Sequence, residues 1–82
     1  MRLDTESLRT LKTVIELGGL TIAAGQLNMT PSAVSWKIKR LESRVGRKLI
    51  HRNGHHIEAT TDALQLLEYA TIIINAHDRA VQ

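Results

Sequence analysis

Residues 30–46 read TPSAVSWKIKRLESRVG and carry the clearest helix signal in the chain. Thr30 is a good N-cap residue, and Pro31 suits the first helical position because its missing N–H has no partner there anyway. Apolar residues follow at steps of four, three and four, at Val34, Ile38, Leu41 and Val45. This spacing is typical of one helix face, and Gly46 is a common residue just past a helix end. The stretch predicts a helix at about 31–45.

Two shorter helices are expected before this one. The first, at about 5–17, begins at Asp4 or Thr5 as the cap and ends at Gly18-Gly19. The second, at about 20–27, ends at Asn28, a residue that favours tight turns. Their apolar stripes are Leu8, Leu11 and Ile15 in the first, and Leu20, Ala23, Ala24 and Leu27 in the second. The pattern predicts two short helices joined by a tight turn to the third.

A short hairpin is expected after the third helix. Leu49-Ile50 is an apolar run, Asn53-Gly54 is a hairpin turn signal, and Ile57 lies on the other side of that turn. We therefore expect a two-stranded wing at about 48–52 and 55–59. Such a hairpin is too short to stand alone and must pack on the helices.

The last helix is expected at about 61–80, with Thr60 or Thr61 as its cap. A helix of this length spans about 30 Å, roughly the width of the whole domain. Its apolar surface exceeds what so small a chain can cover, so a second copy is expected to cover it. The residues predicted to form this dimer interface are Leu64, Leu67, Thr71 and Ile74.

The predicted fold class is therefore mainly α: a winged helix-turn-helix of three helices and a two-stranded wing, followed by a long linker helix. We expect residues 1–59 to form the winged helix-turn-helix domain and residues 60–82 to form the linker and dimerisation helix.

Composition excludes several functions. The chain has no cysteine, which removes disulfides and thiol chemistry, and no apolar run reaches the ~20 residues of a membrane span. We expect no enzyme, since no Gly-x-Ser-x-Gly or phosphate-binding glycine loop is present. His51, His55 and His56 cluster in the wing, but adjacent residues of a strand point to opposite faces, so no metal or other cofactor is expected. Without a signal peptide at its start, the protein is expected in the cytoplasm.

Charge is distributed unevenly along the chain. The net charge is only +3, yet the segment 37–52 holds seven basic residues and one acid, Glu42. The remainder holds four basic and seven acidic residues. A basic block of this kind indicates a surface that faces a polyanion, and a solvated helix face is the alternative that charge alone leaves open.

Several short stretches share their order and spacing with one family. They are Gly19-Leu20-Thr21-Ile22-Ala23-Ala24, Leu27, Thr30, Ser32-Ala33-Val34-Ser35, Ile38-Lys39-Arg40-Leu41-Glu42, Gly46, Leu49-Ile50 and Arg52. Over about residues 3–70, the chain resembles the N-terminal DNA-binding domain of LysR-type transcriptional regulators. Pro31 and Trp36 depart from the pattern, because the family often has glutamine at the first position and a basic or polar residue at the second.

This resemblance implies sequence-specific binding of double-stranded DNA, with the helix 31–45 in the major groove and the wing 48–59 at the minor groove or backbone. It also implies an antiparallel homodimer through 61–80, and a small-molecule effector that acts only through a C-terminal domain absent from this chain. Two alternatives stay open: a protein–protein dimerisation module, and a winged-helix regulator of the molybdate-responsive or MarR type.

The resemblance also assigns candidate DNA contacts. Base or groove contacts are expected from Pro31, Ser32, Ser35, Trp36 and Arg52. Phosphate contacts are expected from Thr21, Thr30, Lys37, Lys39 and Arg40, with Arg44 beside them. Three of these residues have a structural alternative. Trp36 would fold back onto a neighbouring helix, Thr21 would cap its helix, and Arg52 would contact phosphate or make no DNA contact.

Overall fold

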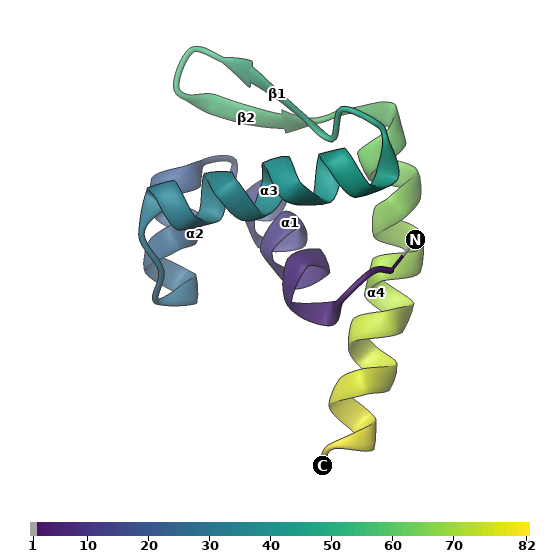
Figure 1. The fold of residues 1–82 in the computed structure, drawn as a ribbon. Coiled ribbons are helices and arrows are strands. Elements are labelled where there is room, and N and C mark those ends of the chain that lie inside the picture. Colours follow the sequence, from purple (N-terminus) through teal and green to yellow (C-terminus); the bar gives the residue numbers. More distant parts are fainter. Residues whose placement is uncertain (1) are drawn as a thin grey trace.

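The computed structural model describes residues 2–82 of the chain. Its elements are α1 (Thr5–Leu17), α2 (Leu20–Leu27), α3 (Pro31–Val45), β1 (Ile50–Asn53), β2 (His56–Ala59) and α4 (Thr61–Ala80). The hairpin lies over α3, and α4 runs along one side of the molecule and extends beyond the other helices (Figure 1). The predicted winged helix-turn-helix with a long final helix is confirmed.

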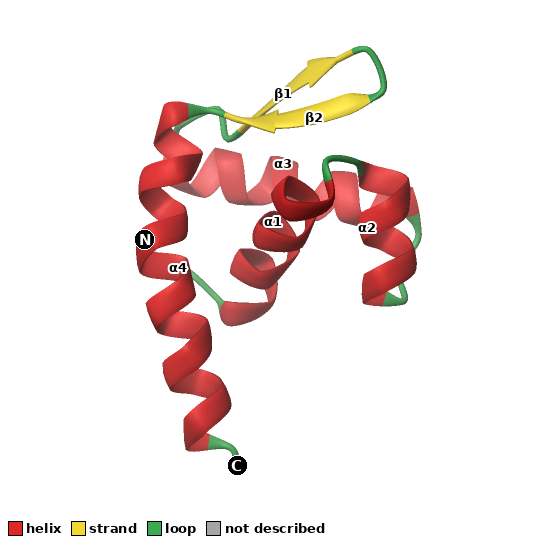
Figure 2. Cartoon of the chain, turned by 180° about the vertical axis from the view of Figure 1, so that it is seen from behind, coloured by secondary structure: helices red, strands yellow, loops and turns green. Residues whose placement is uncertain are grey.

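Helix α1 is the centre of the packing. It contacts α2, α3 and α4, and the view from behind shows it between α2 and α4 (Figure 2). Its residues Leu8, Leu11 and Val14 are fully buried. The rest of the core is Ala23, Ala24, Val34, Ile38, Leu41, Leu49, Ile50, Ile57, Ala63, Ala70 and Ile74. Leucine, isoleucine, valine and alanine therefore supply the whole buried core of the described residues.

Side-chain caps fix where three helices begin. Asp4 Oδ1 accepts the N–H of Ser7 at 2.7 Å at the start of α1. Thr30 Oγ1 and Thr60 Oγ1 accept the backbone N–H three residues ahead at 3.1 Å, at the starts of α3 and α4. These bonds satisfy donors that have no partner inside the helix. The caps explain why the expected helix starts agree with the structure.

Gly18 joins the helices to the hairpin. Its φ of +74° ends α1 in the left-handed region, and its carbonyl oxygen accepts the N–H of Ile57 at 2.9 Å. A Cβ at this position would lie 2.9 Å from Cε1 of His56, closer than real contacts allow. The positive φ therefore calls for glycine at the helix end, whereas a Cβ here would only displace the exposed imidazole of His56.

The hairpin differs from its predicted bounds. It begins at Ile50 rather than at 48, and the pairing of Asn53 with His56 makes Gly54 and His55 the two loop residues. Gly54 has a φ of +64° at the first loop position, as in a type II′ turn. The predicted loop pair Asn53-Gly54 is wrong by one residue, since Asn53 lies within β1.

The segment before β1 binds other partners. Glu42 Oε2 accepts the N–H of Leu49 at 2.7 Å and that of Ile50 at 3.4 Å. Thr60 Oγ1 donates to the carbonyl oxygen of Lys48 at 2.7 Å, and its N–H donates to that of Leu49 at 3.1 Å. Because these groups are taken up by α3 and by the start of α4, β1 begins only at Ile50.

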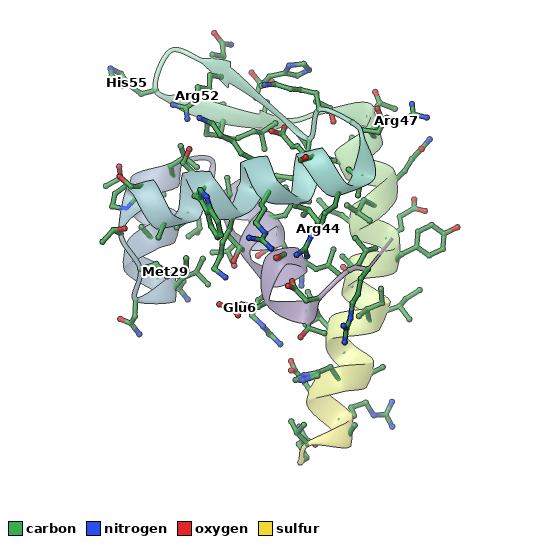
Figure 3. The ribbon with its side chains drawn as sticks, in the orientation of Figure 1. Glu6, Met29, Arg44, Arg47, Arg52 and His55 are labelled. Atoms are coloured by element: carbon green, nitrogen blue, oxygen red, sulfur yellow. The ribbon has the colours of Figure 1, made fainter. Side chains whose placement is uncertain are left out.

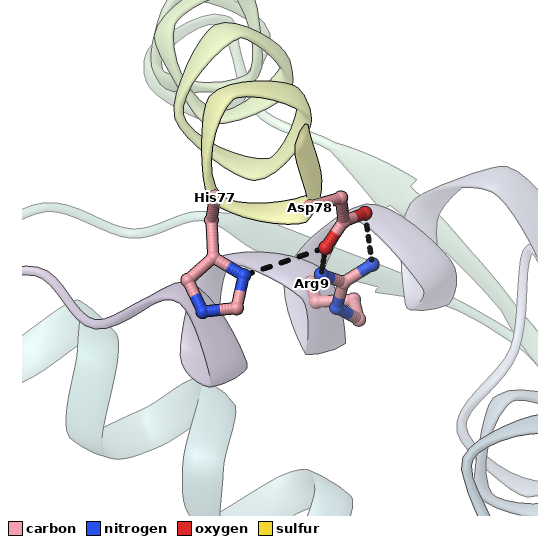
Figure 4. Close-up of polar contacts among 3 residues, drawn as sticks. All are labelled: Arg9, His77 and Asp78. Carbon is pink, nitrogen blue, oxygen red and sulfur yellow. Dashed lines mark hydrogen bonds and ion pairs between the residues drawn. The ribbon is translucent and has the colours of Figure 1, made fainter. Parts of the chain in front are cut away.

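An ion pair ties α1 to the far end of α4. Arg9 Nη2 lies 2.7 Å from Asp78 Oδ1, and Nη1 lies 3.4 Å from Oδ2 (Figure 4). The Nδ1 atom of His77 is 3.4 Å from the same Oδ1. The hydrogen bonds from Arg9, followed by the one with His77, hold the pKa of Asp78 below its ordinary value. The pKa of Asp4 is lowered too, chiefly by its hydrogen bonds with Ser7.

We predict that Glu42→Ala destabilises the fold more than Glu42→Gln. Alanine leaves the N–H groups of Leu49 and Ile50 without their acceptor, which costs about 1–3 kcal/mol, whereas the amide oxygen of glutamine can still accept. Urea denaturation of the two variants measures the difference. Glu16→Ala, at an exposed position of α1, is the control. Equal unfolding midpoints for Glu42→Ala and Glu16→Ala would contradict this role.

We also predict a loss of stability in acid that depends on the Arg9–Asp78 pair. The pKa of Asp78 is lowered on folding, so its contribution is fully present above the ordinary value of 3.8 and is lost as pH falls through the lower folded value. Asp78→Asn should therefore be less stable than the parent near neutral pH, and the difference should shrink below about pH 3.8. Denaturation curves across pH measure this trend.

Arg9→Gln should produce the same pH-dependent loss, and adding it to Asp78→Asn should produce no further loss. A stability difference for Asp78→Asn that stays constant down to pH 2 would contradict the prediction.

Candidate nucleic-acid interface

Part of the basic block is neutralised inside the chain. Lys37 Nζ lies 2.9 Å from Glu6 Oε1, and Arg44 Nη1 lies 3.7 Å from Asp4 Oδ2. Both acids sit at the start of α1, where a helix dipole favours negative charge. Lys37, predicted to contact phosphate, is therefore in an ion pair in this structure, as is Arg44, and their phosphate contacts stay predictions. The partner acids come from a segment 30 or more residues away, which explains why inspection of the block alone missed them.

Four cations of the block have no acidic partner among residues 2–82. They are Lys39, Arg40, Lys48 and Arg52. Figure 3 shows Arg52 on the hairpin, and Arg47 at the far end of α3, where its Nη1 lies 3.9 Å from Asp62 Oδ1. The cations without an acidic partner are thus concentrated on α3, on β1 and on the short segment between them.

Three adjacent hollows cover this face. One, between α3 and β1, is lined by Ser35, Lys39 and Arg52 among others. A second, between the start of α2 and the hairpin, includes Thr21 and again Arg52. A third, on the outer side of α3, is lined by Pro31, Ser32, Ser35, Trp36 and Lys39. Shared residues connect the hollows, so seven of the ten predicted contact residues lie on one continuous surface.

Trp36 does not fold back onto a neighbouring helix. Its side chain is exposed, with 58% of the residue's surface accessible. The guanidinium carbon of Arg40, one turn further along α3, lies 5.0 Å from the centre of the indole. This distance is typical of a cation–π contact. The guanidinium of Arg40, which is predicted to contact phosphate, thus lies over the ring of Trp36 in this structure.

The start of α2 offers free backbone donors at the same face. Its N-cap is Gly19, which has no side chain to accept a hydrogen bond. Thr21 is exposed and makes no capping bond, so its alternative role as a cap is not observed. Thr30 is also exposed, although its hydroxyl is occupied as the cap of α3.

Two residues of this surface were missed by sequence reasoning. Ile22 is exposed beside Thr21 in the second hollow, and Lys48 lines the first. Ile22 lies off the apolar stripe of α2, and an apolar residue in such a position could have signalled a contact surface. Lys48 gave no signal beyond its charge, because its position depends on how the segment 47–49 leaves α3.

Helix α4 carries a second, apolar surface. Leu64 is 56% exposed and Ile72 is 66% exposed, while Leu67 and Thr71 are half-buried at the edge of the core. Ile74, predicted in the dimer interface, is only 3% exposed and belongs to the core of its own chain. It faces inward because Ala63, Ala70 and Ile74 form the stripe of α4 that packs against the core.

Other kinds of site are not indicated in the described part of the chain. No group of three or more histidine or acidic side chains within residues 2–82 is placed to hold a metal ion. Among the same residues, no helix has both the length and the apolar character needed to cross a membrane.

Fold and surface together define a winged helix-turn-helix domain with a basic, partly apolar face on its third helix. Residues 5–64 match the family model described as "Bacterial regulatory helix-turn-helix protein, lysR family". The chain belongs to this LysR family of bacterial regulators, and not to the molybdate-responsive or MarR-type alternatives. The family is one of transcriptional regulators rather than of enzymes.

Curated relatives are full-length regulators. The HTH-type transcriptional regulator LysG of Mycobacterium tuberculosis (strain ATCC 25618 / H37Rv) is 45% identical over 69 residues, which cover 84% of this chain and 22% of LysG. PecT of Dickeya dadantii (strain 3937) is 36% identical over 80 residues, 98% of this chain and 25% of PecT. The chain thus spans about a quarter of the length of these relatives.

Solved structures share the fold. The chain is similar to the CbnR DNA-binding domain in its complex with DNA, with a TM-score of 0.90, 26% identity, and coverage of 95% of this chain and 90% of that one. ArgP from Mycobacterium tuberculosis is 40% identical with a TM-score of 0.86, and 98% of this chain covers 30% of ArgP. The BenM DNA-binding domain bound to a benA site has a TM-score of 0.89 at 25% identity, with coverage of 96% and 89%.

Proposed function

We propose that this domain binds double-stranded DNA sequence-specifically, as the DNA-binding part of a LysR-type transcriptional regulator. The observation that carries the proposal is the placement of the four unpaired cations of the basic block on α3, on β1 and on the segment between them, beside the hollows lined by Ser35, Lys39 and Arg52. The similarity to the CbnR and BenM domains in complex with DNA supports it.

Helix α3 is the element that enters the major groove, which is wide enough to admit one α-helix. Its exposed N-terminal turns present Pro31, Ser32, Ser35 and Trp36 toward base edges. Lys39, Thr21 and Thr30 are placed to contact phosphates on either side, which fixes the register of the helix. Arg52 on the wing reaches the minor groove or the adjacent backbone. Lys37 is left out, because Glu6 holds it.

Residues 1–59 carry the DNA contacts in this proposal, and residues 60–82 link two copies. The flank of α4 with Leu64, Leu67 and Thr71 packs against the same flank of a second chain, while Ile74 stays in the core of its own chain. Two domains would then address half-sites about 34 Å apart or a multiple of that distance.

The whole regulator acts in the cytoplasm in this proposal and has no catalytic activity. Any small-molecule effector binds outside residues 1–82 in this proposal.

We predict that Lys39→Ala and Arg52→Ala each reduce the salt dependence of DNA binding. Each lost phosphate contact should lower the slope of log K against log salt concentration by about 1. Fluorescence anisotropy with a duplex selected from a random library measures affinity at several salt concentrations. Lys12→Ala, which removes a cation on α1 from its pair with Glu16, is the matched control and should leave the slope unchanged. Unchanged affinity and slope for both Lys39→Ala and Arg52→Ala would refute the assigned face.

We predict that Leu64→Glu and Thr71→Glu convert a dimer to a monomer. A charge on this flank of α4 would have to be buried without a partner on association, and charged groups are costly to desolvate. Sedimentation velocity measures the mass of each variant. Tyr69→Glu changes an exposed residue around the helix from Leu64 and is the matched control.

These substitutions test the dimer interface more directly than a deletion of residues 60–82 does. The deletion would also remove Ala63, Ala70 and Ile74 from the core. A dimer that persists in both Leu64→Glu and Thr71→Glu would place the interface elsewhere.

A further inference from the structure

Trp36 is one wall of the hollow on the outer side of α3. The other lining residues are Pro31, Ser32, Ser35 and Lys39, all within two turns of the start of the helix. Arg40 lies over the indole but does not line this hollow. The indole therefore takes part in two arrangements at once: it lines the hollow, and it carries the guanidinium of Arg40 at 5.0 Å from its centre.

Arg40 gives the indole a defined position. A long side chain on a helix points back toward the N-terminus, so Arg40 reaches Trp36 four residues earlier. The contact limits how far an otherwise exposed indole can rotate, and in this position the ring lines the hollow. Arg40 is thus a positioning residue, and Trp36 is the group that presents the contact surface.

The remaining side chains of the hollow discriminate poorly among bases. Serine hydroxyls donate as well as accept, so Ser32 and Ser35 tolerate several base edges. No asparagine, glutamine, arginine or acid lies within residues 31–39 to make a bidentate base contact. Lys39 is the one residue of the hollow with a charged donor. The distinctive features are the two apolar rings, of Pro31 and Trp36.

An apolar hollow in the major groove fits one chemical group of the base pairs. The C5-methyl of a pyrimidine is the apolar feature that base edges present there. Thymine carries this methyl, and 5-methylcytosine carries the same group in the same position.

We propose that the Trp36 hollow, with the indole held by Arg40, binds a pyrimidine C5-methyl group and makes it a determinant of the operator sequence. This inference rests on the proposed function, since it requires α3 to lie in the major groove.

Atomic substitution in the DNA tests the proposal. A duplex is first selected from a random library with the intact chain. Each thymine is then replaced in turn by deoxyuridine, which keeps the pairing and removes only the methyl. We expect one or two positions per half-site where affinity falls about fourfold, the loss for one buried methyl-sized group.

Variants of the protein assign the effect to the hollow. Trp36→Ala should bind the thymine and uracil duplexes with equal affinity at those positions. Tyr69→Ala removes the other exposed aromatic side chain, on α4, and should keep the parent's fourfold ratio. Arg40→Gln should shrink the thymine-to-uracil ratio, and Arg40→Lys, which can still lie over the ring, should restore part of it. Because this is a ratio of affinities, a simple loss of phosphate contact would not change it.

A second arm separates the two sources of the methyl. Cytosines of the selected site are replaced one at a time by 5-methylcytosine. If affinity falls when a thymine is replaced, the hollow binds thymine. If affinity rises on cytosine methylation and the rise depends on Trp36, the hollow binds 5-methylcytosine.

The outcomes also separate this proposal from the proposed function. Salt-dependent binding to the selected duplex, combined with flat uracil and methylcytosine scans, overturns the methyl contact and leaves DNA binding intact. The same holds if Trp36→Ala keeps the parent's discrimination. If the library yields no enriched duplex and the chain shows no salt-dependent binding, both proposals fail.

Discussion

The carboxylate of Glu42 ties α3 to the segment that leads into β1, and Thr60 ties the same segment to α4. Glu42 lies on α3 and accepts the N–H groups of Leu49 and Ile50, so it fixes where the chain leaves the helix and where β1 begins. Hydrogen bonds to a charged acceptor are stronger than those between neutral groups, and these two are partly buried. Thr60 binds the same segment and also caps α4. The positions of the wing and of α4 relative to α3 therefore depend on one short stretch of backbone.

The basic side chains of α3 differ between its inner side, which packs against α1, and its outer side. Acids at the start of α1 pair with Lys37 and Arg44 on the side of α3 that packs against that helix. The cations on the outer side of α3 and on β1 have no acidic partner among residues 2–82 and remain available to bind another molecule. Pairs of this kind at the surface add little to stability, but they decide which cations remain available. The proposed DNA-binding face is thus selected by intramolecular pairing as well as by the sequence of the basic block.

The sequence was sufficient wherever a feature depends on near neighbours along the chain. Caps such as Thr30, left-handed ends such as Gly46 and the period of Val34, Ile38 and Leu41 determine the helices locally, and these predictions agree with the structure. Predictions failed where a distant segment decides the outcome. The hairpin starts late because Glu42 binds the backbone before it, and Ile74 faces inward on the stripe that it shares with Ala63 and Ala70. The ion pair of Lys37 with Glu6 also joins distant segments, while the phosphate contact expected of Lys37 stays a prediction. Trp36 was predicted correctly as exposed, but its contact with Arg40 required the side-chain geometry.

Helix α4 has to serve the core and the proposed dimer at once, and its fixed angle is what allows both. Its inner stripe completes the core around α1, so it cannot swing away without exposing Leu8 and Leu11. Thr60 holds its first turn and the Arg9–Asp78 pair holds its last, which fixes its direction at both ends. In a dimer formed through the outer flank, the distance between the two α3 helices would then be set by α4 alone. In the proposed dimer, the spacing of half-sites on DNA would follow from how each chain packs α4 against its own core.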